Sequence, residues 1–246
     1  MQEHFVKSFS YSSFACLKSK GMHNACLYVQ EMMKYCKRIW NNYYIIKMDV
    51  TKYFKNIDKQ ILYEILCRKI KDKNLLWLSR EILYSNGVDK GLPIGNYTSQ
   101  CFANIYLNEL DQYMKHKLKL KYTCRYMDDV VALVNTKEEA IEKLNLIRSF
   151  LKDKLCLELN RKTQIFKSTQ GVNFCGYKIN EYRLKIRDKG KRKLKKKVKF
   201  LEKQVKQGKM TSKEAHKYLS GHLGYINVAS TKNLENKLFA TEIWIY

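Results

Sequence analysis

The sequence contains a single proline, Pro93, and only 10 glycines among its 246 residues. Proline and glycine interrupt helices and strands and are enriched in linkers, so the chain carries no obvious linker between domains. An apolar fraction of 45% is normal for a folded protein and argues against wholesale disorder. A chain of this length can bury a sizeable core, either as one large domain or as two smaller ones.

Paired cysteines are also absent. The eight cysteines stand alone along the chain, and no two of them form a C-x-x-C pair. Zinc sites commonly depend on such pairs, and disulfide frameworks are needed mainly by small secreted proteins. We therefore expect ordinary, mostly buried thiols, with neither zinc nor disulfides.

No run of about 18 apolar residues is present to span a membrane. The first residues, MQEHFVKSFSYSS, lack the apolar stretch of a signal peptide, and we expect a cytoplasmic protein. Acidic residues are scarce too, because 23 Asp and Glu oppose 48 Lys and Arg and leave a formal charge of +25. Such a surplus indicates a polyanionic partner, most often nucleic acid, with an anionic membrane surface as the alternative.

The pattern of apolar residues predicts a mixture of helices and strands. Helical spacing runs through residues 22–39, and residues 43–50 form a β-rich run. YTCRYMDDVVALV at 122–134 is two short β-prone runs separated by Met-Asp-Asp, which is typical of a hairpin. The other expected elements are helices within 57–85, a loop before a helix at 97–118, a helix at 137–153, and strands at 156–159, 163–167, 173–179 and 182–187.

Three carboxylates stand out in this acid-poor chain. Asp128 and Asp129 are adjacent at the tip of the expected hairpin, and Asp49 lies near the end of an apolar strand, where aspartate is unfavourable. Adjacent carboxylates repel each other unless a cation neutralises them, whereas the simpler interpretation is a solvated Asp-Asp turn. Oxygen ligands of this kind suit Mg²⁺, and two such ions can stabilise both oxygens of a phosphoryl transfer.

Basic residues concentrate toward the C-terminal end. Residues 178–209 contain 15 Lys and Arg against three acids, and six of the seven residues of KRKLKKK at 191–197 are basic. An apolar stripe with helical spacing runs through the same segment and consists of Leu194, Val198, Leu201 and Val205. This pattern predicts a basic amphipathic helix that binds nucleic-acid phosphates, with a merely solvated face as the alternative.

Five segments resemble, in the same order, the motifs of the reverse transcriptase family. They are KMDVTKYFKNID at 47–58, GLPIGNYTSQCFANIYLNELD at 91–111, YMDD at 126–129, LNRKT at 159–163 and FCGYKI at 174–179. The resemblance implies an α/β (α+β) right-hand polymerase whose antiparallel palm sheet is backed by helices. Its expected parts are partial fingers at 1–45, a palm at 46–180 with residual fingers helices at about 57–90, and a helical thumb at 181–246.

The same resemblance implies the catalytic roles. Asp49, Asp128 and Asp129 would hold two Mg²⁺ ions, for which Mn²⁺ can substitute, and the backbone carbonyl of Val50 is a further candidate ligand. The implied reaction is DNA synthesis, with an RNA template, a DNA primer and dNTPs as partners and no membrane. Candidate primer and template contacts are Tyr126, Met127, Phe174, Gly176, Lys193, Lys195, Lys196 and Lys197.

Nucleotide selection is expected at a different set of residues. Phe54 falls where the family places an aromatic ring that leaves no room for a 2′-hydroxyl. Neighbouring Tyr53 is the alternative gate, and a core role is the structural alternative for Phe54. Further candidates in the loop are Ile94, Gly95 and Gln100. Lys162 is another candidate, with an ordinary surface lysine as the alternative. Relatives carry an arginine at the position of Leu17, and Lys20 is the nearest basic residue that can replace it.

The segment GLPIGNYTSQ points to one branch of the family. Many relatives carry Gln at the position of Ile94 and end this segment in Ser-Pro, where this chain has Ser99 and Gln100. The present form, together with SSFACLKSKGMHNA at 12–25, resembles the reverse transcriptases of diversity-generating retroelements. These bacterial or phage enzymes copy template adenines with frequent errors. The resemblance also implies a small basic accessory protein as a partner. The alternatives are a group II intron, retron or phage-defence enzyme, and a catalytically weak RNA-binding remnant.

Overall fold

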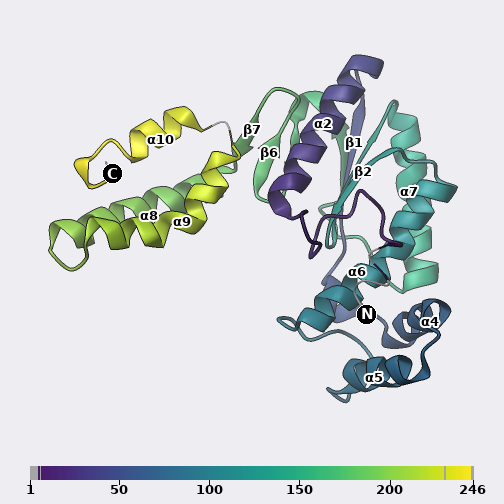
Figure 1. Ribbon diagram of the computed structural model, residues 1–246. Helices are drawn as coiled ribbons and strands as arrows, with labels where there is room; N and C mark the ends of the chain where they lie inside the picture. Colours follow the sequence, from purple (N-terminus) through teal and green to yellow (C-terminus); the bar gives the residue numbers. More distant parts are fainter. Residues whose placement is uncertain (1–4, 6, 230, 245–246) are drawn as a thin grey trace. The chain divides into compact units, whose positions relative to one another are not determined.

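Four of the β-prone runs form an antiparallel sheet (Figure 1). Its strands are β1 (Tyr44–Asp49), β2 (Tyr122–Tyr126), β3 (Asp129–Val134) and β4 (Gln164–Lys167), in the order β2-β3-β1-β4. Every residue of β3 after Asp129 is buried, which requires that both faces of the sheet be covered. In the computed structural model, which describes residues 5, 7–229 and 231–244, two helices supply that cover.

Helices α2 (Met22–Trp40) and α7 (Lys137–Leu155) lie on opposite sides of the sheet (Figure 1). The first packs on β2 and β3, and the second packs on β1, β3 and β4. Both are amphipathic, and α2 buries the apolar stripe Ala25, Cys26, Val29, Met32, Met33 and Cys36. The side chain of Thr136 caps α7 by accepting a hydrogen bond from the Glu139 amide. The helices predicted at 22–39 and 137–153 are confirmed.

Helix α6 (Tyr97–Gln112) is the central helix of this part of the chain, because most of its residues are buried. Among them are four polar side chains, Ser99, Asn104, Asn108 and Asp111, which must find partners inside the protein. The helix was expected to continue to residue 118, but it changes at Tyr113 into a single π-helical turn, η1 (Tyr113–Lys117). A π turn widens the helix and redirects the side chains that follow it.

The expected helical region 57–85 consists of two helices preceded by a short turn. These elements are α3 (Tyr53–Asn56), α4 (Lys59–Lys69) and α5 (Lys73–Tyr84). Asp58 and Asp72 separate them, because each aspartate accepts hydrogen bonds from the first backbone amides of the helix that follows. Two N-caps within 15 residues of each other therefore divide the predicted helical region 57–85 into separate helices.

Two strand predictions are wrong in detail. Residues 156–159 do not form a strand of the sheet, because α7 ends in a left-handed residue, Cys156, and only Leu159 makes an isolated bridge to Val50. Residues 173–179 are not one strand but two, β5 (Val172–Phe174) and β6 (Tyr177–Ile179), which pair with each other. The turn between them has positive φ at both Cys175 and Gly176, the backbone form that tight hairpins favour.

The part of the chain from Gly171 onward forms a separate compact unit. Its three-stranded sheet contains β5, β6 and β7 (Leu184–Ile186), in that order. Helices α8 (Asp188–Lys206) and α9 (Ser212–Asn227) pack against each other and are followed by α10 (Lys232–Leu238) and η3 (Glu242–Trp244). The predicted basic amphipathic helix is confirmed in α8, which buries Leu194, Val198 and Leu201.

The boundary between the two units lies between Gln170 and Gly171, whereas the palm and the thumb were expected to meet between residues 180 and 181. Residues 171–180 join the second unit because β5 and β6 pair with β7 and not with the four-stranded sheet. The division into fingers, palm and thumb is a functional assignment and stays a prediction.

No helix within residues 5, 7–229 and 231–244 is long and apolar enough to cross a membrane. The three longest, α2, α7 and α8, have 19 residues each, and each contains several charged residues. This finding agrees with the lack of an 18-residue apolar run in the sequence.

Candidate active site

Strand pairing brings the three aspartates together. In the register of β1 and β3, Asp49 is the direct partner of Asp129, so two residues far apart in the sequence face each other across adjacent strands. Asp128 precedes Asp129 in the turn between β2 and β3. Met127 in the same turn has a φ of 55°, a left-handed conformation that is uncommon for a residue with a side chain and is frequent at functional sites.

The electrostatic environment of Asp128 is unfavourable for negative charge. Burial raises the pKa of Asp128, and the nearby Asp49 carboxylate raises it further, while Lys47 and Arg125 act in the opposite direction. The Lys47 ammonium forms an ion pair with the Asp129 carboxylate, and both side chains are partly buried. One cation against three carboxylates leaves uncompensated negative charge, which a divalent cation would neutralise.

Asn160 holds Asp49 from the neighbouring segment and was not identified from the sequence. Its backbone amide donates to the Asp49 carbonyl at 2.7 Å, and its side-chain Nδ2 donates to Asp49 Oδ2 at 3.2 Å. These two bonds orient the carboxylate at the end of β1. The sequence signal for Asn160 is its position inside the LNRKT motif, in which the predicted site residue is Lys162.

The donor set fits a divalent metal that is also coordinated by substrate. Within the described part of the chain, no three His, Cys, Asp or Glu side chains form a ready-made metal cage. Carboxylates at a Mg²⁺ site are commonly completed by water and substrate phosphates, so a partial protein set is sufficient. The bridge between Val50 and Leu159 uses the Asp49 carbonyl and the Thr51 amide, so it leaves the Val50 carbonyl available as the expected extra ligand.

A buried arginine supports the turn that carries Asp128. Arg125 and Asp111 form an ion pair with side-chain exposures of 1% each, and the guanidinium donates to both carboxylate oxygens at 2.7–2.9 Å. The same group donates to the Met127 carbonyl at 3.0 Å and to Asn104 Oδ1 at 3.2 Å. Arg125 was not identified from the sequence, because a buried arginine cannot be distinguished from an exposed one by pattern.

The structure separates the two candidates for the sugar gate. The Tyr53 side chain is buried, with 2% of its surface exposed, and its hydroxyl donates to the Ala103 carbonyl at 2.5 Å. Its alternative role as a nucleotide contact is therefore corrected to a core role. Phe54 is only partly buried and packs edge-on against the Tyr53 ring at 5.6 Å, so part of it stays accessible.

The loop expected to contact the nucleotide is tied to the same short helix. The Leu92 amide donates to the Phe54 carbonyl at 2.7 Å. Gly91 lies so close to the Lys55 backbone that a Cβ added to Gly91 would be 3.0 Å from the Lys55 carbonyl oxygen. Beyond this anchor, the Ile94 side chain is 76% exposed, and Gly95 has a φ of 107°. The loop therefore exposes the Ile94 side chain, while the hydrogen bond between Leu92 and Phe54 fixes the start of the loop.

The remaining nucleotide candidates have less direct support. Gln100 accepts a hydrogen bond from the Cys16 thiol at 3.1 Å, and Lys162 is exposed. The Lys20 ammonium donates to the backbone carbonyls of Tyr11 and Ser13, which occupies it within the N-terminal segment. These contacts place none of the three side chains against the aspartates.

The primer and template candidates fall in both units of the chain. In the first, Tyr126 and Met127 are partly buried beside the aspartates. In the second, Phe174 is buried, with 1% exposure, and its expected primer contact stays a prediction. A Cβ on Gly176 would lie 2.0 Å from the Tyr225 hydroxyl oxygen, which makes glycine necessary there.

The lysines of α8 form an exposed face. Lys193, Lys195 and Lys196 are exposed, as the amphipathic pattern requires. Lys197 is partly buried and lies over two aromatic rings, those of Phe200 at 5.8 Å and Tyr218 at 5.4 Å. A lysine face of this kind is suited to phosphate contacts that do not depend on base sequence.

Comparison with known proteins places this site in context. A family model described as "Reverse transcriptase (RNA-dependent DNA polymerase)" matches residues 1–179. The chain is 25% identical to the putative COX1/OXI3 intron 2 protein of Saccharomyces cerevisiae, with 71% of this chain and 27% of that protein covered. It is 26% identical to the retron Ec73 reverse transcriptase of Escherichia coli, with 95% of this chain and 76% of that protein covered.

A third relative, protein YkfC of Escherichia coli strain K12, is 24% identical over 73% of this chain and 58% of its own length. The chain thus spans only 27% and 58% of two of these three relatives. Among solved structures, apo telomerase from Candida tropicalis matches with a TM-score of 0.58 and 15% identity, covering 76% of this chain and 43% of that chain. Telomerase from Candida albicans has the same TM-score at 11% identity, and these similarities show a common fold.

The ion pair under the turn generates the first prediction. Arg125→Met leaves the Asp111 carboxylate buried without its partner, and we expect a loss of about 3–5 kcal/mol in the free energy of unfolding. Adding Asp111→Leu removes both charges and should restore at least half of that loss. Hydrogen–deuterium exchange of peptides covering β2 and β3 measures the effect in the first unit alone. Equal exchange in the single and double variants would contradict the assignment.

Proposed function

The chain belongs to the reverse transcriptase family, and from this premise we propose that it is an RNA-directed DNA polymerase. The observation that carries the proposal is the register of β1 and β3, which pairs Asp49 with Asp129 directly beside Asp128. A solvated Asp-Asp turn would not require a third carboxylate on the facing strand. The mixed helix and antiparallel sheet fold shared with telomerase structures supports the same activity.

In the proposed reaction, the 3′-hydroxyl oxygen of a DNA primer attacks the α-phosphate of a dNTP paired with an RNA template. A new phosphodiester bond forms, the hydroxyl proton is released, and pyrophosphate leaves. Divalent-metal dependence is general in this family. We propose that Asp49, Asp128, Asp129 and the Val50 carbonyl would hold two Mg²⁺ ions, or Mn²⁺ in their place. The ions would lower the pKa of the hydroxyl and neutralise the leaving oxygens.

The protein's own residues supply the positioning. Asn160 orients the Asp49 carboxylate, and Arg125 fixes the turn through the Met127 carbonyl. Lys47 reduces repulsion among the carboxylates through its ion pair with Asp129. Groups that are held in place before the substrate arrives do not have to be reorganised during the reaction.

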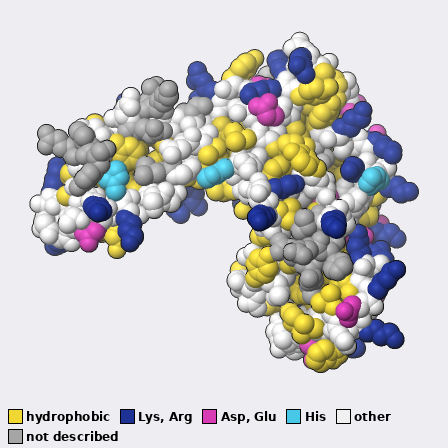
Figure 2. Space-filling model, viewed as in Figure 1, with side chains coloured by type: hydrophobic (Ala, Val, Ile, Leu, Met, Phe, Trp, Pro, Cys, Tyr) yellow, Lys and Arg dark blue, Asp and Glu magenta, His cyan; other side chains and the backbone are white. Residues whose placement is uncertain are grey.

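We assign partial fingers to residues 1–45, the palm to 46–180 and the thumb to 181–246. In this assignment, the exposed lysines of α8 grip the phosphates of the primer–template duplex. Lys and Arg side chains are numerous on the visible face of the molecule, whereas Asp and Glu are few (Figure 2). The net charge of +25 favours such a polyanionic partner.

Asp128→Asn tests the activity. An amide cannot replace the carboxylate at a metal, and the loss of several kcal/mol of transition-state stabilisation lowers the rate of DNA synthesis about 1,000-fold or more. The assay is primer extension on poly(rA)/oligo(dT) with Mg²⁺ and then with Mn²⁺. Asp153→Asn removes the same charge from an exposed position on α7 and should leave the rate unchanged. Synthesis by the Asp128 variant within a few-fold of the parent would refute the metal assignment.

Phe54→Ala tests the sugar gate. Removal of the partly accessible ring opens space beside the sugar, so the preference for dNTPs over rNTPs should fall by about tenfold or more, equivalent to about 1.4 kcal/mol. Tyr53→Phe is the matched control, because it removes a buried hydroxyl and keeps the ring, and it should retain the preference. Single-nucleotide incorporation kinetics with both nucleotide types give the ratio. An unchanged ratio in the Phe54 variant would place the gate elsewhere.

We further propose that the enzyme is error-prone and serves a diversity-generating retroelement, with a small basic accessory protein. Support comes from Ile94 in place of the glutamine of many relatives and from its 76% exposure on a loop anchored to Phe54. An aliphatic side chain supplies no hydrogen bond to fix the incoming nucleotide. The intron and retron relatives keep those branches, and an RNA-binding remnant, as alternatives.

Ile94→Gln tests the retroelement proposal. One hydrogen bond from a well-placed amide is worth about 1 kcal/mol, so misincorporation opposite template adenine should fall by roughly fivefold to tenfold and more than opposite other bases. Val88→Gln, at another exposed apolar position, is the control. The measurement is sequencing of cDNA made by the three proteins on one RNA. An accurate parent enzyme would rule out the diversity-generating assignment.

A further inference from the structure

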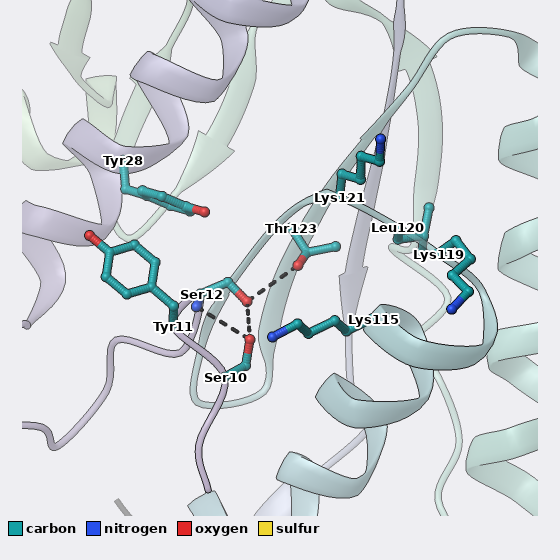
Figure 3. Close-up of a pocket in the computed structure, with 9 residues that line it drawn as sticks. All are labelled: Ser10, Tyr11, Ser12, Tyr28, Lys115, Lys119, Leu120, Lys121 and Thr123. Carbon is teal, nitrogen blue, oxygen red and sulfur yellow. Dashed lines mark hydrogen bonds between the residues drawn. The ribbon is translucent and has the colours of Figure 1, made fainter. Parts of the chain in front are cut away.

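A cavity of about 370 Å³ lies in the first unit, where the start of β2 meets the π turn after α6 and the N-terminal segment (Figure 3). Three of its lining residues are lysines: Lys115 in the π turn, and Lys119 and Lys121 in the connection to β2. Figure 3 shows the Lys115 side chain directed toward the serines of the N-terminal segment.

The lining is positively charged without compensation. It contains no aspartate or glutamate, and within the described residues none of the three lysines forms an ion pair with a carboxylate. Lysines on an open surface are simply solvated, but three of them around one concavity raise its affinity for anions. The ligand that suits three separated ammonium groups is one with several phosphates in a row.

Hydroxyl groups form one wall of the cavity. The Ser10 and Ser12 hydroxyls lie 2.8 Å apart, and the Thr123 hydroxyl donates to Ser12 Oγ at 3.3 Å. All three residues are buried, so this row of hydroxyls is fixed before any ligand arrives. Hydroxyls can both donate and accept, which suits sugar and phosphate oxygens.

An accessible aromatic ring stands beside the hydroxyls. Tyr11 is 74% exposed, and its ring meets the ring of Tyr28 edge-on at 5.8 Å. The Lys20 ammonium holds this segment by donating to the Tyr11 carbonyl and lies 4.7 Å from the centroid of the Tyr11 ring. A tyrosine ring that is held in place with much of its surface open is a platform on which a nucleobase can stack.

The cavity is distinct from the aspartate site. Thr123 lies near the opposite end of β2 from the turn that carries Asp128, and the three residues from Thr123 to Tyr126 correspond to roughly 10 Å of strand. The lysines of the cavity also belong to a different segment from the lysines of α8.

We propose that this cavity is a second RNA site, which binds a single-stranded segment by its phosphates on Lys115, Lys119 and Lys121, with one base stacked on Tyr11. This inference rests on the proposed function only in taking the bound strand to be a part of the template RNA that is not being copied. The site would hold that RNA on the enzyme while the primer–template duplex moves through the aspartate site.

The test uses the full chain and a fluorescent decamer of single-stranded rA, with binding measured by anisotropy at several salt concentrations. Replacing the three cavity lysines with glutamine should weaken binding and reduce the slope of log affinity against log salt by about 0.7 per lost phosphate contact, or about 2 in total. The control replaces Lys69, Lys137 and Lys154, three exposed lysines of α4 and α7, with glutamine and changes the net charge equally.

Tyr11→Ala should lower the affinity for the decamer about fivefold or more, because one stacked base is lost, whereas Tyr11→Phe should retain it. Primer extension on poly(rA)/oligo(dT) should proceed at the parental rate in all these variants. A parent protein that extends no primer would refute the proposed activity, while the binding comparison would still decide the cavity.

Three results would overturn the proposal. The first is equal affinity and equal salt slope in the cavity and control lysine variants, which would mean that the cavity lysines are solvated. The second is cavity-dependent binding of a dA decamer with the same affinity as the rA decamer, which would mean that the cavity binds single strands of either kind and is not an RNA site. The third is binding of phosphatidylserine vesicles that depends on the cavity lysines while RNA binding does not, which would assign it to a membrane surface.

Discussion

The buried ion pair between Arg125 and Asp111 is the interaction on which the geometry of the first unit depends. Neither charge can be stabilised by water, because each side chain has an exposure of only 1%. The other N–H groups of the guanidinium reach Asn104 on α6, Ser13 in the N-terminal segment and the Met127 carbonyl in the turn that carries Asp128. One side chain therefore joins strand β2, helix α6, the N-terminal segment and the turn. A turn held in this way keeps its carboxylates in place against their mutual repulsion, which a preorganised active site requires.

Charge in this protein acts at two distances. The chain carries a net charge of +25, yet among the residues that the structure describes only Lys47 forms an ion pair with a carboxylate of the aspartate site. Exposed charges separated by more than about 8 Å are largely screened at physiological salt, so the net charge of the chain does not by itself neutralise the aspartates. The positive surplus instead attracts a polyanion to the surface of the protein, and the local negative charge at the site calls for a divalent cation. The proposed nucleic-acid partner and the proposed metal ion therefore depend on charges in different parts of the chain.

The predictions succeeded where a local pattern decides the structure and failed where backbone conformation or distant contacts decide it. The helices at 22–39 and 137–153 and the hairpin at 122–134 follow from apolar periodicity, since each element buries one side or both. The single strand expected at 173–179 is a hairpin, because left-handed residues at Cys175 and Gly176 reverse the chain. Tyr53 and Phe54 are neighbours of the same chemical type, and only packing shows that the first is in the core and the second is accessible.

The sequence by itself determined the family and the basic character of helix α8, because these depend on residue types and on their order along the chain, and it singled out the three aspartates as the candidate metal ligands. Only the tertiary structure decided which side chains act together. Strand register brought Asp49 opposite Asp129, although 79 residues separate them in the sequence. Asn160 on Asp49 and Arg125 under the turn are contacts between segments that are not neighbours in sequence, and no local pattern encodes such contacts. The lysine-lined cavity arises in the same way, since it exists only where the π turn, β2 and the N-terminal segment come together in the folded chain.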